Sequence, residues 1–306
     1  MNKYRQKSIW KNIVYYRYIY LMLIPVILYY AIFKYAPMYG IQLAFKKYNL
    51  QGGITGSPWI GFENFIYLFK KAEFWQALKN TLVVSFMKLV LGFPVSVILA
   101  IFLNEVIFVR LKKIFQVIFT FPHFLSWVIL SSIMFNLLSN SGAVNNLFEL
   151  AGIGRMNFLT NKETFRFLLV YSEVWKEAGW GTIIYIATIA NIDPSLYEAA
   201  IIDGANRWNK IRFITWPGIK SVVITMLILQ VGHMMSAGFM QIFNLYNPSV
   251  YSVADILDTY IYRETFNVIP NFGLTTAMGL FTGLTNCILL LTANFISKKF
   301  GEKGIV

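Results

Sequence analysis

The chain has 306 residues, of which 57% are hydrophobic, 17% aromatic and 13% charged. Its mean hydropathy of +0.56 exceeds what a soluble domain of this length could bury, so the composition excludes a soluble globular protein and indicates several membrane helices. The formal net charge of +13 could suggest a nucleic-acid-binding protein, but the distribution of the basic residues along the chain argues against that class.

Six stretches of the sequence are apolar and long enough to cross a bilayer, which takes about 20 residues per helix. They lie at residues 18–38, 78–103, 114–138, 165–191, 216–245 and 272–296. A basic segment precedes the first stretch, but its apolar run is longer than the roughly 7 to 15 residues of a signal-peptide core. We therefore expect an all-α integral membrane protein whose first helix is not cleaved.

The basic residues gather in regions that six spans would place on one side of the membrane. These regions are the amino terminus, the loops after the second and fourth spans, and the carboxyl terminus; their basic residues are Lys3, Arg5, Lys7, Lys11, Arg17, Arg110, Lys112, Lys113, Arg207, Lys210, Arg212, Lys220, Lys298, Lys299 and Lys303. Cytoplasmic loops carry an excess of Lys and Arg. The pattern predicts a multi-pass protein of the plasma membrane with both termini in the cytoplasm, and it gives no support to a nucleic-acid partner.

The fourth span contains ionisable residues at a depth where they are costly unless paired or hydrated. Glu173, Glu177 and Trp180 share a helical face, and Lys176 could pair with Glu173 or Trp180 across one turn. With Tyr185, these residues are candidates for a substrate path; the alternative is a structural ion pair near the outer surface. Lys88 in the second span is expected to pair with a carboxylate or a carbonyl, without a functional role.

The loop between the fourth and fifth spans, residues 193–215, is polar. Asp193-Pro194 is a helix-start signature, Gly204 can end that helix near Asp203 in a left-handed conformation, and a second short helix fits residues 206–214. Glu198, Ala199, Ala200 and Asp203 would place carboxylates beside small side chains, a surface that suits a partner rich in arginine. An ordinary connection with helix-favouring alanines is the alternative.

The fifth span carries polar residues at helical spacing. Gln230, His233, Ala237, Gln241 and Asn244 fall within about 80° of one another on a helix, over roughly 21 Å of its axis. This stripe could line a substrate path, and hydrogen bonding between helices explains it equally well.

Catalytic and metal-binding motifs are missing from the sequence. It contains no phosphate-binding loop, no metal-spaced Cys/His cluster and no hydrolase or metalloprotease motif, with only two histidines and one cysteine. We expect neither an enzyme nor a metal site. An ion-driven secondary transporter is an alternative, although neither the internal repeats nor the broken helices common in that class are evident in the sequence. A membrane-bound enzyme would have to rely on Glu173, Glu177 and His233.

The loop has a recognisable pattern: Glu198-Ala199-Ala200, three residues, Gly204, nine residues, then Ile214, one residue and Trp216-Pro217. It resembles the signature loop of permease subunits in binding-protein-dependent ABC importers, although Trp216 stands where leucine is usual. The segment Lys34-Tyr35-Ala36-Pro37-Met38-Tyr39-Gly40 resembles the branch that contains polysaccharide and multiple-sugar importers of the maltose type.

This resemblance implies a type I importer permease fold of six transmembrane helices with a cytoplasmic coupling helix. Residues 1–77 would form the tail, first helix and extracellular loop, residues 78–297 the permease core, and residues 298–306 the final tail. Glu198 would pair with a basic residue of a cytoplasmic ATPase, and Gly204 would make the bend. Ala199, Ala200 and Ala205 would fit the ATPase cleft, with Asp203 and Pro217 belonging to the same coupling set.

The partners implied are two ATPase subunits, a second and usually non-identical permease, a lipid-anchored extracellular substrate-binding protein and membrane lipid. ATP and Mg²⁺ would be bound by the ATPase, with no cofactor on this chain. The cargo would be an oligosaccharide or a polysaccharide fragment; a non-sugar solute is the alternative.

Overall fold

The computed structural model describes residues 11–266, 270–301 and 304. Nearly all of this part of the chain that forms regular structure is helical, and its strand-like pairing is confined to an isolated bridge between Lys46 and Trp59. The expected all-α membrane class is therefore confirmed. The chain forms two compact units, residues 1–67 with 271–280 and residues 68–270 with 281–306, which we describe separately.

Unit one contains a long apolar helix. Helix α2 (Arg17–Tyr30) continues through the π-helical η1 (Ala31–Tyr35) and the 3₁₀-helical η2 (Ala36–Phe45). Together they form a candidate span of 29 residues, with no buried residue in its most apolar part. It extends beyond the expected 18–38. The following loop contains α3 (Gly53–Gly56) and is closed by Lys46, whose Nζ donates to the carbonyl of Ile54 at 2.7 Å.

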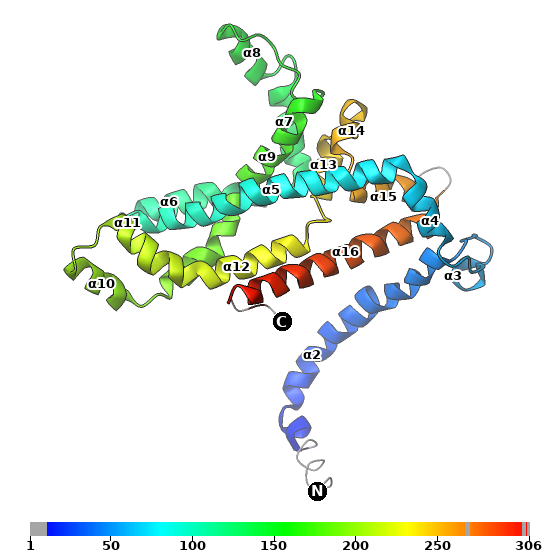
Figure 1. Ribbon diagram of the computed structural model, residues 1–306, viewed down its shortest axis with the longest axis horizontal. Coiled ribbons are helices and arrows are strands. Elements are labelled where there is room, and N and C mark those ends of the chain that lie inside the picture. Colours follow the sequence, from blue (N-terminus) through cyan, green and yellow to red (C-terminus); the bar gives the residue numbers. More distant parts are fainter. Residues whose placement is uncertain (1–10, 267–269, 302–303, 305–306) are drawn as a thin grey trace. The chain divides into compact units, whose positions relative to one another are not determined.

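Unit two holds most of the helices, which Figure 1 shows in sequence colours. Helix α4 (Glu63–Lys70) leads into it from unit one, and α16 begins in unit one and ends in unit two. The remaining elements are α5 (Ala72–Glu105), α6 (Val109–Thr120), η3 (Phe121–Phe124), α7 (Trp127–Leu138), α8 (Ala143–Leu150), α9 (Lys162–Ala190), α10 (Pro194–Ile202), α11 (Arg207–Lys210), η4 (Ile211–Thr215), α12 (Trp216–Gly232), α13 (Phe239–Leu245), η5 (Pro248–Val250), α14 (Tyr251–Ala254), α15 (Leu257–Thr265) and α16 (Phe272–Lys299).

Five helical stretches of the described chain are long and apolar enough to span a membrane: 17–45, 72–105, 127–150, 207–232 and 272–299. The fourth expected span, residues 165–191, is also helical as part of α9. It is less apolar than those five stretches, because the charged residues Glu173, Lys176 and Glu177 lie near its middle. The residues that the sequence marks as a candidate site are thus the ones that lower the apolar character of this helix.

Two expected spans are interrupted, contrary to the continuous helices predicted at 114–138 and 216–245. The third span changes from α6 to η3 at Phe121 and resumes as α7 at Trp127, because Pro122 cannot donate a helical hydrogen bond. The fifth span stops at Gly232 and resumes at Phe239, after Gly238 has adopted a φ of +95°. Broken helices at membrane depth are tolerated where the freed backbone groups find partners or line a cavity.

Two apolar clusters hold unit two together along α5 and α9. One joins Val84 and Leu169 to residues of α7 and α13, and the other joins Val97 and Ile189 to residues of α12. The turns of α5 and α9 between these residues therefore lie between the two apolar clusters.

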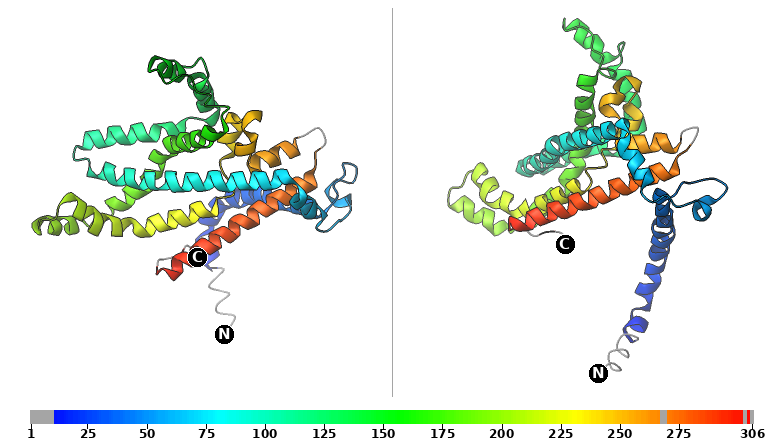
Figure 2. Two further views of the ribbon diagram at one scale, coloured as in Figure 1. Left: turned by 45° about the horizontal axis from the view of Figure 1, so that its top comes forward. Right: turned by 45° about the vertical axis from the view of Figure 1, so that its right-hand side comes forward.

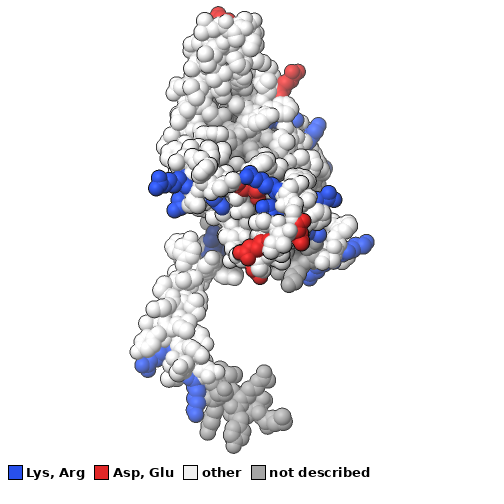
Figure 3. Space-filling view, turned by 90° about the vertical axis from the view of Figure 1, so that its left-hand side faces the viewer, with Lys and Arg blue, Asp and Glu red and all other residues white. Residues whose placement is uncertain are grey.

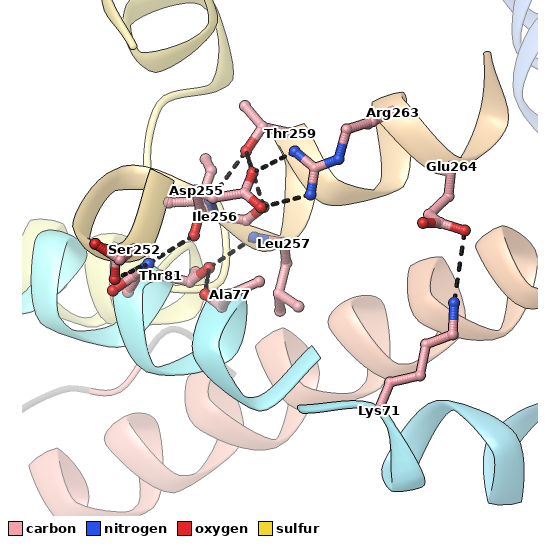
Figure 4. Close-up of polar contacts among 11 residues, drawn as sticks. Lys71, Ala77, Thr81, Ser252, Asp255, Ile256, Leu257, Thr259, Arg263 and Glu264 are labelled. Carbon is pink, nitrogen blue, oxygen red and sulfur yellow. Dashed lines mark hydrogen bonds and ion pairs between the residues drawn. The ribbon is translucent and has the colours of Figure 1, made fainter. Parts of the chain in front are cut away.

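Polar contacts join α14, α15 and the residues between them to the start of α5 (Figure 4). The hydroxyl of Thr81 accepts a hydrogen bond from the backbone N–H of Leu257 at 2.9 Å, and Asp255 Oδ2 lies 2.7 Å from Arg263 Nη2. Lys71 and Glu264 form a further ion pair at 3.8 Å. These contacts fix α14 and α15 at one end of unit two, whereas α10 and α11 lie at the other end (Figures 1 and 2).

Candidate functional site

Helix α10 is a short, well-capped helix whose two ends form as the sequence predicts. At its start, Asp193 Oδ1 accepts a hydrogen bond from the backbone N–H of Ser195 at 2.9 Å, and this hydrogen bond, with one from the Ser195 side chain, lowers the pKa of Asp193. At its end, the N–H of Ala205 donates to Ala200 O at 2.8 Å and that of Gly204 donates to Ile201 O at 3.1 Å. This is a Schellman motif, and Gly204 supplies the left-handed conformation with a φ of +74°.

No residue of α10 is buried. Glu198, Ala199, Asp203 and Gly204 are exposed, as is Pro217 in the first turn of α12, while Ala200 and Ala205 are half-buried. Three large apolar side chains of α10 are exposed as well: Leu196, Ile201 and Ile202, the last by 86%. Large apolar side chains that a short helix leaves exposed together mark an interaction surface.

The second helix of the loop differs from the prediction of 206–214. Helix α11 begins after Asn206, whose Oδ1 accepts from the N–H of Asn209 at 2.8 Å, and then runs through η4 directly into α12. A hydrogen bond of 2.9 Å between the hydroxyls of Tyr197 and Thr215 ties α10 to η4. The loop is therefore joined to the fifth span by continuous helix. Figure 3 is viewed from the side that carries this loop, and it shows Lys and Arg side chains beside a few acidic side chains.

A cavity of about 850 Å³ lies between α5, α9, α12 and the break at residues 233–238. It occupies the gap between the two apolar clusters. Six of the substrate-path candidates line it: Glu173, Glu177, Trp180, Tyr185, Gln230 and His233. Lys176, Gln241 and Asn244 do not line it.

Lys88 lines this cavity and contacts three polar groups around it. Its Nζ donates to the carbonyl of Ala237 at 2.8 Å and to Gln241 Oε1, and it lies 3.5 Å from Glu173 Oε2. Its expected pairing with a carboxylate or a carbonyl is confirmed, since it contacts both. Glu173 Oε2 is buried and has no hydrogen-bond partner within the described residues, although it faces Lys88 as an ion pair.

A second polar cluster joins α9 to the break in the third span. Lys176 Nζ donates to Glu177 Oε1 at 2.7 Å and to the carbonyl of His123 at 2.8 Å. His123 Nδ1 lies 2.6 Å from Glu177 Oε2, and its ring stacks on Trp180 with centroids 4.2 Å apart and planes 6° apart. Lys176 therefore pairs with its neighbour Glu177 and not, as expected, with Glu173 or Trp180, because η3 brings an additional carbonyl and imidazole to this face of α9.

The stripe predicted on the fifth span is not continuous, because the helix breaks between Gly232 and Phe239. Gln230 and His233 remain on the cavity. Gln241 is fully buried and donates to Leu169 O at 2.7 Å and to Ser172 Oγ at 2.8 Å, while Asn244 donates to Met240 O at 2.7 Å. In this structure these two amides bind helix backbone and neighbouring side chains.

Helical spacing in the sequence pointed to neither His123 nor Ser172, and Lys88 had no predicted function. His123 lies 54 residues before Glu177, and Lys88 lies 149 residues before Ala237, so helical spacing could not connect them. The signal available for His123 was Pro122, which predicts a break in the helix and hence free backbone groups.

These features define a helical membrane protein with a cavity beside its broken spans, lined in part by polar side chains, and with a capped, exposed helix at one end. The chain belongs to the family described as the inner membrane component of binding-protein-dependent transport systems, whose model matches residues 77–302. Its fold is that of the type I ABC importer permeases, as the resemblance of the loop implied.

Two curated relatives and one solved structure are similar over almost the whole chain. The "Polygalacturonan/rhamnogalacturonan transport system permease protein YteP" of Bacillus subtilis is 43% identical, over 99% of this chain and 94% of that protein. "Protein LplB" of the same organism is 40% identical, over 94% and 91%. A bacterial alginate ABC transporter, crystallised in complex with an alginate pentasaccharide-bound periplasmic protein, contains a chain that matches with a TM-score of 0.88 and 39% identity, over 97% of this chain and 99% of that one.

Proposed function

We propose that this chain is a permease subunit of an ATP-driven importer of carbohydrate, and that its cargo is an oligosaccharide or polysaccharide fragment. The observation that supports this cargo most directly is the 43% identity, over nearly the full length of both chains, to a permease named for polygalacturonan and rhamnogalacturonan transport. The similarity to an alginate transporter supports the same class.

The cavity would form this subunit's half of the translocation path. Glu173, Glu177, Gln230 and His233 offer acceptors and donors for sugar hydroxyls, and Trp180 is 45% exposed. His123 covers one face of that indole ring. The opposite face would then pack against the apolar face of a sugar ring.

Coupling to ATP hydrolysis would occur through α10. Its exposed apolar residues and Glu198 would seat in a cytoplasmic ATPase subunit, which would bind ATP and Mg²⁺ in place of this chain. Two such ATPases, a second permease and an extracellular substrate-binding protein would complete the importer, with both termini of this chain in the cytoplasm. Because α11, η4 and α12 are continuous, a displacement of α10 would be transmitted to Gln230 and His233 at the far end of α12.

The experiment that tests this function is reconstitution of the tagged protein with the subunits that co-purify with it, followed by uptake measurements in proteoliposomes. We expect ATP-dependent uptake of oligogalacturonides, which Trp180→Ala weakens. Trp75→Ala, at an exposed tryptophan of α5 outside the cavity, is the matched control and should leave uptake unchanged. Uptake that persists without ATP and follows a proton gradient would contradict the importer assignment. ATP-driven uptake of a non-sugar solute would contradict only the cargo.

A further inference from the structure

A second concave site of unit two is an apolar groove of about 670 Å³ between α12 and the carboxyl-terminal part of α16. These two helices run side by side in Figures 1 and 2, where they are yellow and red. The apolar side chains that line the groove include Ile224, Leu227, Val231, Leu289, Ile296 and Phe300. The groove shares no residue with the transport cavity.

One end of the groove carries two of its polar lining residues together with Phe300, and we call it the polar end. Lys220 lies in the second turn of α12, and Ser297 lies in the last turn of α16, so both belong to the same end. From Lys220 to Val231 the helix advances 11 residues, or about 16 Å at about 1.5 Å per residue. This length matches one leaflet, about half of a hydrocarbon core of about 30 Å, and is too short to seat a helix that crosses the whole membrane.

The polar end carries chemistry that suits a phosphate group. Lys220 lines the groove, and the exposed Lys298 and Lys299 follow in the last turn of α16. Ser297 is only 8% exposed, and its hydroxyl has no hydrogen-bond partner in the part of the chain that the structure describes. Thr292, one and a half turns earlier, instead bonds the carbonyl of Ile288 at 2.7 Å, as hydroxyls in helices commonly do.

We propose that this groove binds an anionic phospholipid. One acyl chain lies along the apolar residues between α12 and α16, and the phosphate group is held by Lys220 with a hydrogen bond from Ser297. Basic pockets between membrane helices, at the level of the headgroups, attract anionic lipids in this way. Because α12 begins at the coupling loop, the bound lipid would brace the helix that joins α10 to the cavity. The inference is independent of the cargo.

The test is native mass spectrometry of the assembled protein, with the subunits that co-purify, released from nanodiscs of phosphatidylglycerol and phosphatidylcholine in equal parts. We expect phosphatidylglycerol to be retained in preference to phosphatidylcholine. Lys220→Gln should lower this retention about five-fold, since one lysine near the membrane surface contributes about that factor. Ala293→Trp, which fills the groove from α16, should abolish it. Lys113→Gln removes the same charge from the exposed surface of α6 and should have no effect.

The proposal is overturned if Lys220→Gln retains phosphatidylglycerol as the unsubstituted protein does. It is also overturned if a cysteine at position 293, in a Cys287→Ser background, forms a cross-link to the second permease, because a protein helix would then cover the groove. If Ala293→Trp fails to assemble, the comparison of Lys220→Gln with Lys113→Gln decides the question. Neither result would decide whether the assembled protein performs ATP-dependent uptake, which is the separate test of the proposed function.

Discussion

Lys88 should be the residue of the cavity wall on which the stability of unit two depends most. Lys88→Met removes the donor from three acceptors at once, namely Ala237 O, Gln241 Oε1 and the Glu173 carboxylate. Leaving a buried acceptor unsatisfied costs about 1 to 3 kcal/mol, and an unpaired buried charge costs more. Glu173 lines the cavity and its side chain is 28% exposed, so water compensates part of this cost and we expect a loss of about 3 kcal/mol. Glu173→Gln leaves Lys88 with two acceptors and should cost only about 1 kcal/mol.

The assay is the thermal midpoint of the detergent-solubilised protein, followed by fluorescence-detected size-exclusion chromatography. Lys88→Met should lower the midpoint well below that of Glu173→Gln. The double variant should be less destabilised than the sum of the two, because the pair is already broken in each single variant. Lys79→Met, at an exposed position on the same helix, is the control and should stay within about 0.5 kcal/mol. Equal midpoints for the two single variants, or strict additivity in the double variant, would refute the reasoning.

Three further predictions concern the coupling helix. Glu198→Lys reverses an exposed charge that makes no ion pair or side-chain hydrogen bond with the described residues, so membrane insertion should persist while co-purification of an ATPase is lost. Unchanged co-purification would remove Glu198 from the coupling surface. Gly204→Val forces a branched residue to a φ of +74°, at a cost of roughly 1 to 2 kcal/mol. Limited proteolysis should therefore cut the loop faster in this variant than in Gly204→Asn. Equal rates of cleavage would contradict the Schellman geometry. Hydrogen bonds from Ser195 lower the pKa of Asp193. The stabilisation that the Asp193 carboxylate gives to α10 is therefore present above the unfolded pKa of about 3.9, and it is lost as the pH falls through the lower pKa of the folded state. Protection of the loop from pepsin should accordingly fall with decreasing pH, whereas Asp193→Asn, whose amide oxygen accepts without titrating, should show no such fall; identical profiles would refute this account.

Local chemistry explains which parts of the chain were predictable from sequence. Asp193 and Gly204 define the two ends of α10 because a helix start needs an acceptor for its free N–H groups and a helix end needs a left-handed residue. The distribution of apolar and charged residues likewise indicated a helical membrane protein. The resemblance of the Glu198-Ala199-Ala200 loop to an importer permease then predicted the family that the comparison confirms.

The breaks in the third and fifth spans were not predicted, because an apolar run of about 25 residues reads as a continuous helix. The fifth span can break at residues 233–238 because Lys88 on α5 supplies a donor to the freed carbonyl of Ala237, and the third can break at Pro122 because Lys176 on α9 does the same for His123. Helical periodicity compares residues three or four positions apart and therefore cannot detect such partners.

By itself, the sequence determined the membrane class, the helical content and the ends of α10, because these depend on composition and on contacts within one turn. Tertiary structure alone decided which charges meet. Glu173 faces Lys88, Glu177 binds both Lys176 and His123, and Gln241 is buried while Gln230 lines the cavity. Pairing within a membrane is fixed by whichever helix supplies a donor at the same depth, and that depends on how α5, α9 and the broken spans pack together.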